Sequence, residues 1–216
     1  PVKDISPYKR ILRSNLFNGK INFNRFPSLE AQVAAISDDI AYNNHDLEDG
    51  LRAGLFTIKK FSSIPHMAKL TDKHVKQVKS FRKEIIISQI VRELINLMVV
   101  DVIDTTNKNL KKSNPQSIND IYNQNRLIVD FSDKMKSIVN QMRIFLKHNM
   151  YNHREVIANT NKGKKIINDL FKYLIRNPKK YIVRDLLKKD SKERAVADFI
   201  AGMTDRYAIN LHKKIK

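Results

Sequence analysis

Asp38, Tyr42 and Asp46 are the residues of this sequence whose types and spacing most clearly favour chemistry. They are four residues apart, so on a helix they form one row along a single face. The carboxylates of such a row can bind a hard divalent cation. The tyrosine can stack on a sugar or a base, and the second carboxylate can accept a hydrogen bond from a hydroxyl group. The row is therefore a candidate site for a cation and a sugar or base.

The same stretch also has a structural interpretation, as the acidic and solvated end of a helix. Acidic side chains near a helix C-terminus interact unfavourably with the helix macrodipole, and Asp46, Glu48 and Asp49 crowd this end. That cost favours a function for the acidic residues. On physical grounds alone, the functional and the structural interpretation are equally open.

The adjacent pair of His45 and Asp46 does not by itself make a metal site. An HD-superfamily site takes its ligands in the order His, His-Asp and a later Asp, and no histidine precedes His45 in this sequence. One neutral imidazole and one carboxylate also leave a divalent cation with too few ligands. We therefore interpret His45 as a structural residue.

Helices are the elements that must position these residues. Ser28 is a typical N-cap, and apolar residues recur at helical spacing after it, which predicts a helix from Ser28 to about Gly50. The same reasoning predicts a helix capped by Asp72 that ends before a polar break at residues 107–115. Three further helices are predicted over residues 117–148, 152–177 and 195–211. No alternating strand pattern competes with them, so the predicted fold class is an all-α helical bundle.

The net charge identifies the class of partner to consider first. The 216 residues include 41 Lys and Arg against 22 Asp and Glu, which gives a formal charge of +19 and favours nucleotides or nucleic acid as partners. Residues 107–180 alone hold 16 basic and 5 acidic residues, so a phosphate-binding face is expected there. Lysines also commonly decorate solvated helix faces, and that interpretation stays open. No helix-turn-helix spacing or zinc finger is present to read base edges.

The absence of cysteine excludes disulfides, thiolate zinc sites and cysteine nucleophiles. No apolar run approaches the roughly 20 residues that span a membrane, and the first residues do not form a signal peptide. We therefore expect a cytoplasmic protein with no membrane partner. The sequence begins with Pro1, which favours either removal of an initiator or origin in a longer polypeptide.

Three stretches, in the same order, resemble the bacterial deoxyguanosinetriphosphate triphosphohydrolase-like family of the HD superfamily. They are residues 28–54 (SLEAQVAAISDDIAYNNHDLEDGLRAG), 94–106 (LINLMVVDVIDTT) and 195–208 (AVADFIAGMTDRYA). The resemblance extends over essentially the whole chain but corresponds only to the C-terminal portion of the family's proteins. It implies an HD-type helical bundle, in which residues 1–106 are the last part of the catalytic core and residues 107–216 form a basic C-terminal helical lobe.

The resemblance implies hydrolysis of dGTP-like deoxynucleoside triphosphates to deoxynucleoside and tripolyphosphate, by metal-assisted attack of water with magnesium or manganese. Asp38 would be the final aspartate of the metal motif, and Tyr42 and Asp46 would contact the deoxyribose. Basic side chains from later helices would neutralise the triphosphate, although the resemblance assigns no individual one. No further catalytic residue is assigned. We also expect a homo-oligomer.

One departure from the family limits this expectation. The His and His-Asp ligands that precede the final aspartate in the family have no counterpart in this sequence, and one Asp cannot hold a catalytic metal. We therefore expect a fragment, the product of a split gene or an inactive remnant, in that order. The alternative functions are a non-catalytic basic helical module that binds nucleic acid or nucleotide through residues 107–180, and a purely structural helical subunit.

Overall fold

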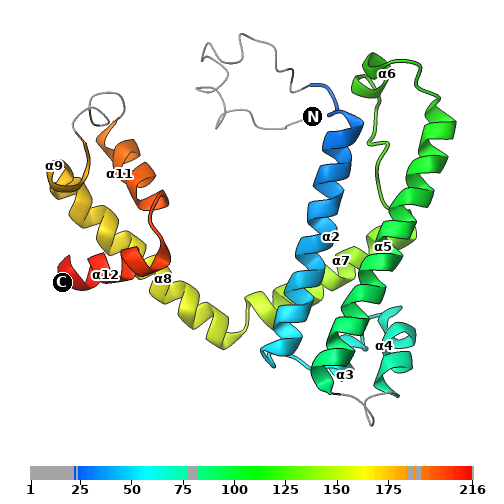
Figure 1. The fold of residues 1–216 in the computed structure, drawn as a ribbon, viewed down its shortest axis with the longest axis horizontal. Coiled ribbons are helices and arrows are strands. Elements are labelled where there is room, and N and C mark those ends of the chain that lie inside the picture. The colour runs from blue at the N-terminus through cyan, green and yellow to red at the C-terminus, as the bar shows by residue number, and fades with distance from the viewer. Residues whose placement is uncertain (1–21, 23, 77–81, 184–186, 188–190, 216) are drawn as a thin grey trace. The chain divides into compact units, whose positions relative to one another are not determined.

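A computed structural model of the chain describes residues 22, 24–76, 82–183, 187 and 191–215. These residues form helices and no strand, so the all-α prediction is confirmed (Figure 1). In chain order the helices are α2 (Leu29–Arg52), α3 (Ile58–Phe61), α4 (Met67–Val75), α5 (Lys83–Ser113), α6 (Ile118–Tyr122), α7 (Asp133–Leu146), the π-helical turn η2 (Lys147–Tyr151), α8 (Arg154–Arg176), α9 (Pro178–Tyr181), α11 (Lys192–Ala201) and α12 (Asp205–Ile215). None of these helices is both long enough and apolar enough to cross a membrane.

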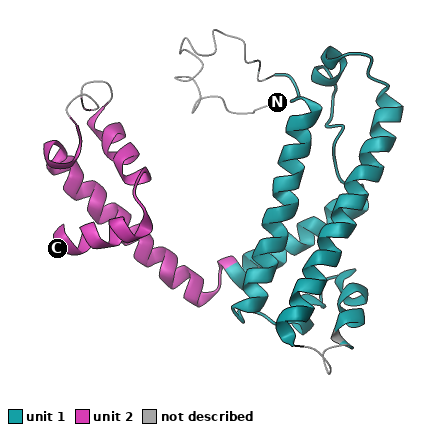
Figure 2. Cartoon of the chain, viewed as in Figure 1, with its two compact units in different colours: residues 1–150 teal, residues 151–216 magenta. Residues whose placement is uncertain are grey.

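The chain divides into two compact units, residues 1–150 and 151–216 (Figure 2). The functional division expected between residues 106 and 107 falls within α5, and it stays a prediction. In the second unit α8 packs against α11 and α12, and buries a core that includes Leu170, Leu174 and Val196.

The helix predicted from the Ser28 cap is α2. The Ser28 hydroxyl accepts a hydrogen bond from the Ala31 amide at 3.4 Å, and the helix continues to Arg52. Ile40, Leu47 and Leu51 lie on one stripe of α2 and are buried, because this stripe packs against α5. The opposite face of α2 is therefore outside the core of this unit.

Aromatic packing holds α7 in the first unit beside α2 and α3. The ring of Phe145 meets the rings of Phe56 and Phe61 edge to face, with centroid distances of 4.9 and 5.7 Å. All three side chains are buried in the core. This packing matters for the site, because α7 supplies basic side chains that face α2.

The second predicted helix differs from the structure at both of its ends. Asp72 lies inside α4 and caps nothing, and α5 begins only at Lys83. The predicted polar break is wrong, since α5 continues to Ser113 before Asn114 adopts a left-handed conformation at φ 40°. Lysine and asparagine cost little on a solvated helix face, so a polar stretch alone does not end a helix.

The helix predicted over residues 117–148 is interrupted, since α6 ends at Tyr122 and α7 begins at Asp133. The Gln32 side chain of α2 accepts hydrogen bonds from the Ile128 and Val129 amides, at 2.9 and 3.0 Å. In a continuous helix, those amides would donate to carbonyls of the preceding turn. A contact from far along the chain therefore prevails over local apolar periodicity.

The last predicted helix, over residues 195–211, is divided in two. Gly202 caps α11, and α12 begins at Asp205. The intervening residues change the direction of the chain, so that both helices pack against α8.

Candidate functional site

Asp38, Tyr42 and Asp46 lie on the face of α2 that points away from the core. Asp38 is exposed, Asp46 is half-buried and the Tyr42 side chain is 58% exposed. Each step along the row is four residues, or about 6 Å of helix rise. The structure therefore brings the three predicted residues onto one accessible face, and their individual roles stay predictions.

An arginine from α7 reaches α2 beside this row. Arg143 Nη2 lies 3.0 Å from Asp39 Oδ1, and Arg143 Nε donates a hydrogen bond to Asn43 Oδ1 at 3.4 Å. Asn43 is buried and donates from Nδ2 to the Asp39 carbonyl at 2.6 Å. The guanidinium is thus held at the surface of α2, next to the turn that carries Tyr42.

Sequence reasoning counted Arg143 among the basic residues of 107–180 but did not distinguish it from the others. Its partner Asn43 is 100 residues away in the chain. No local spacing encodes such a pairing, so only the packing of α7 on α2 could single this residue out.

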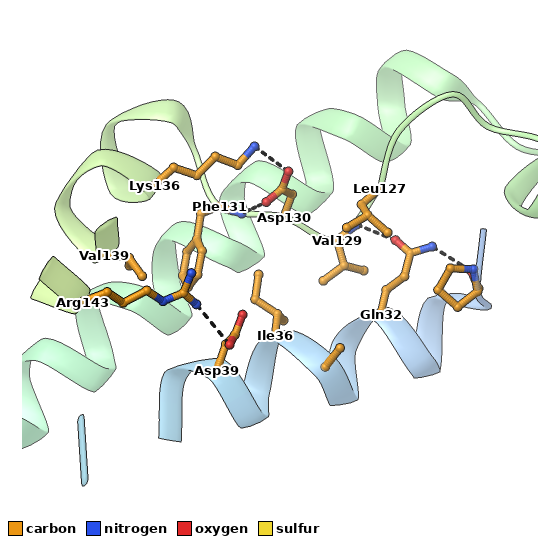
Figure 3. Close-up of a pocket in the computed structure, with 12 residues that line it drawn as sticks. Gln32, Ile36, Asp39, Leu127, Val129, Asp130, Phe131, Lys136, Val139 and Arg143 are labelled. Carbon is orange, nitrogen blue, oxygen red and sulfur yellow. Dashed lines mark hydrogen bonds and ion pairs between the residues drawn. The ribbon is translucent and has the colours of Figure 1, made fainter. Parts of the chain in front are cut away.

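A cavity of about 460 Å³ lies between α2, residues 127–131 and α7 (Figure 3). Its wall combines apolar side chains with two carboxylate–cation pairs. In Figure 3 the apolar side chains are Ile36, Val129, Phe131 and Val139. The ion pairs are Asp39 with Arg143, and Asp130 with Lys136. Lys136 Nζ lies 2.5 Å from Asp130 Oδ2. The cavity thus combines an apolar wall with two cationic side chains, each paired with a carboxylate.

Gln32 fixes one wall of this cavity to α2. Its Oε1 accepts the hydrogen bonds from Ile128 and Val129, and its Nε2 donates to the Pro27 carbonyl at 2.8 Å. The side chain is only 3% exposed, so these bonds form away from water. Because they lie in a shielded environment, losing them leaves buried amides without partners.

Gln32→Leu, which is close in size, is expected to lower the free energy of unfolding by about 2 kcal/mol, because two buried amides lose their acceptor. Urea denaturation followed by circular dichroism measures this change. Gln116→Leu is the matched control, because Gln116 is exposed, and a change within about 0.5 kcal/mol is expected there. A Gln32→Leu protein as stable as the unchanged chain would contradict the role given to Gln32.

The described residues do not complete a metal site. Across residues 24–76, 82–183 and 191–215, no three His, Asp or Glu side chains gather closely enough to hold a metal ion. Asp38 supplies one carboxylate, whereas magnesium is bound by about six oxygen ligands, some of them water. Asp38 can therefore be at most one member of a larger ligand set.

Comparison with known proteins gives one matching domain and several similar proteins. The phosphohydrolase-associated domain matches residues 129–214, a range that includes α7 and the helices of the second unit. The chain is 47% identical over 214 residues to the deoxyguanosinetriphosphate triphosphohydrolase-like protein of Pelagibacter ubique, which covers 99% of this chain and 57% of that relative.

Like-named proteins from other bacteria agree. Identity is 36% over 206 residues to the protein of Brucella ovis, covering 92% of this chain and 51% of the relative. Identity is 37% over 197 residues to the protein of Thiobacillus denitrificans, covering 88% of this chain and 50% of that relative. The chain is therefore similar, over almost its whole length, to proteins named deoxyguanosinetriphosphate triphosphohydrolase-like, and the predicted resemblance is confirmed. The chain spans about half the length of the curated relatives that it matches.

Proposed function

We propose that this chain supplies the C-terminal part of a metal-dependent deoxynucleoside triphosphate triphosphohydrolase. The reaction converts a dGTP-like substrate to the deoxynucleoside and tripolyphosphate. The observation that carries this proposal is the row of Asp38, Tyr42 and Asp46 on the face of α2 outside the core, in a chain 47% identical to a protein named for that activity.

Each residue of the row has a distinct proposed role. Asp38 provides one carboxylate ligand to magnesium or manganese, and the other ligands come from polypeptide that this sequence does not include. Tyr42 presents its ring, 58% exposed, to the deoxyribose. Asp46, one turn further along α2, accepts a hydrogen bond from a sugar hydroxyl.

Arg143 is the proposed triphosphate contact among the many basic side chains. Its guanidinium already faces α2 and holds a carboxylate oxygen of Asp39 at 3.0 Å. A phosphate group can take the place of that carboxylate, since the planar guanidinium donates two parallel hydrogen bonds to either group. The Arg143 and Asp39 side chains are 48% and 57% exposed, so a substrate phosphate can reach the guanidinium.

The experiment compares this chain alone with a longer polypeptide. In the longer polypeptide, this chain is preceded by the part of a relative that it does not match. With manganese present, the longer polypeptide is expected to release tripolyphosphate from a deoxynucleoside triphosphate, and the chain alone is expected to release none. Chromatography separates tripolyphosphate from pyrophosphate and orthophosphate. If the longer polypeptide releases no tripolyphosphate from dATP, dCTP, dGTP or dTTP with magnesium or manganese, the proposal is wrong.

A further inference from the structure

The first compact unit has an apolar groove between α2 and α5, two helices that lie side by side (Figure 1). The volume of the groove is about 360 Å³. Seven of the ten residues that line it are aliphatic, and none of the ten is charged. They include Val33 and Ile36 of α2, and Val99 and Ile103 of α5. The groove is therefore a surface on which an apolar partner can pack.

Several aliphatic side chains of this groove are open to solvent. Ile103 is 54% exposed, and Val33 and Val99 are exposed as well. Val100, one helical turn before Ile103, is also exposed and widens this patch. The whole chain has a formal net charge of +19, yet this strip carries no charge. Exposed aliphatic side chains gathered in one uncharged strip favour contact with another polypeptide over contact with water.

The groove lies directly beside the predicted metal ligand. Each residue of α2 is turned by about 100° from the one before it, so consecutive residues face different sides of the helix. Ser37 lines the groove, and Asp38 follows it on the accessible face of α2. Asp39 comes next and pairs with Arg143 of α7. Among the described residues, α7 thus covers α2 on one side of Asp38, whereas the groove on the other side is open.

The part of the relatives that this chain does not match is long enough to cover the groove. The chain aligns over 99% of its own length with 57% of the Pelagibacter ubique relative, so more than two-fifths of that relative is unmatched. By the family resemblance, the unmatched part precedes this chain. The proposed function requires it to supply the other metal ligands, which places them within about 5 Å of the Asp38 carboxylate, since all of them bind one ion. The open groove, one residue away, is the apolar surface available to it.

We propose that the groove between α2 and α5 is the docking surface for an apolar helix face of the polypeptide that precedes this chain in its relatives. The aliphatic side chains of that helix fill the groove and cover Val33, Val99 and Ile103. Removal of this apolar surface from water holds the preceding part, with its metal ligands, beside Asp38. The inference rests on the proposed function for the position of the partner, but docking is measured without hydrolysis.

Alkylation of a cysteine placed in the groove tests docking directly, because the chain contains no cysteine of its own. Ile103→Cys is expected to react with N-ethylmaleimide about tenfold or more slowly in the longer polypeptide than in this chain alone, since a thiol must be accessible to react. Mass spectrometry of the labelled peptide distinguishes this thiol from any in the added part. Ile118→Cys is the matched control, because Ile118 of α6 is also 54% exposed and lies outside the groove. Its rate is expected to be the same in both polypeptides.

The alkylation rates also separate this partner from other occupants. Equal rates for the Ile103→Cys thiol in the two polypeptides would show an uncovered groove and would overturn the proposal. Equal slowing at both positions would overturn it as well, because the shielding would not be specific to the groove. A second copy of this chain is the alternative occupant. If alkylation of this chain alone slows as its concentration rises, and sedimentation shows a dimer, the groove binds a second copy and the proposal is wrong.

A charge placed in the groove gives a second measurement. Ile103→Glu is expected to lower the melting temperature of the longer polypeptide by about 5 °C or more, because docking would bury a carboxylate without a partner. In this chain alone the side chain stays in water, so a change below about 2 °C is expected. Ile118→Glu is expected to have an equally small effect in both polypeptides. A small and equal shift from Ile103→Glu in the two polypeptides would contradict docking.

Docking and hydrolysis can fail separately. A longer polypeptide that shields the Ile103→Cys thiol but releases no tripolyphosphate would support docking and refute the hydrolase proposal. A longer polypeptide that releases tripolyphosphate without shielding that thiol would support the hydrolase proposal and overturn docking at this groove.

Discussion

Replacing Asp38 with asparagine is expected to lower the triphosphohydrolase activity of the longer polypeptide by about 100-fold or more. Asparagine keeps the size of the side chain but removes the negative charge that a divalent cation requires from its ligand. Because Asp38 is exposed on α2, the helical fold is expected to remain. Initial rates of tripolyphosphate release, measured across a range of manganese concentrations, give both the loss of rate and the weakened dependence on metal.

The control for Asp38 is an acidic residue on another helix. The Asp133 side chain, at the start of α7, is fully exposed, and its Oδ1 lies 3.9 Å from Lys136 Nζ. Asp133→Asn is therefore expected to change the rate by less than about twofold. If Asp38→Asn hydrolyses at the same rate as the unchanged polypeptide, Asp38 is not a metal ligand.

Replacing Arg143 with alanine is expected to lower kcat/KM by about 100-fold, because the charge on the triphosphate loses a positioned guanidinium. Arg143→Lys is expected to recover only part of this loss, since lysine keeps the charge but not the two parallel hydrogen bonds. Steady-state kinetics with dGTP measure both variants in the longer polypeptide.

The Asp39→Asn variant distinguishes two possible roles of Arg143, binding phosphate and holding α7 against α2. Asp39→Asn removes the 3.0 Å ion pair but leaves the guanidinium in place. If Arg143 contacts the substrate, Asp39→Asn keeps most of the activity that Arg143→Ala loses. Equal losses in the two variants would show that only the ion pair matters, and the phosphate contact would be rejected.

The parts of the fold that sequence predicted well are those set by neighbouring residues. The Ser28 cap and the buried stripe of α2 act within a few turns of one helix, so local spacing is enough to predict them. The same spacing placed Asp38, Tyr42 and Asp46 on one helix face, and in the structure they do share one face of α2. Whether that face binds metal and sugar is not decided by helix geometry.

The parts that sequence could not predict depend on contacts between distant residues. The interruption between α6 and α7 follows from Gln32, which accepts hydrogen bonds from amides 96 and 97 residues away. The approach of Arg143 to α2 and the meeting of Val33 with Ile103 at one groove likewise require the packed helices. Apolar periodicity contains no information about which distant side chain competes for a backbone amide.

The most direct test of the central claim is a crystal structure of the longer polypeptide with manganese and a non-hydrolysable deoxynucleoside triphosphate. Anomalous scattering locates the manganese without reference to the ligands. We expect a carboxylate oxygen of Asp38 within coordination distance of the ion, about 2.0–2.6 Å, with the deoxyribose against Tyr42 and Asp46. Manganese bound to the substrate with the Asp38 carboxylate far from the ion would contradict the proposed role of Asp38.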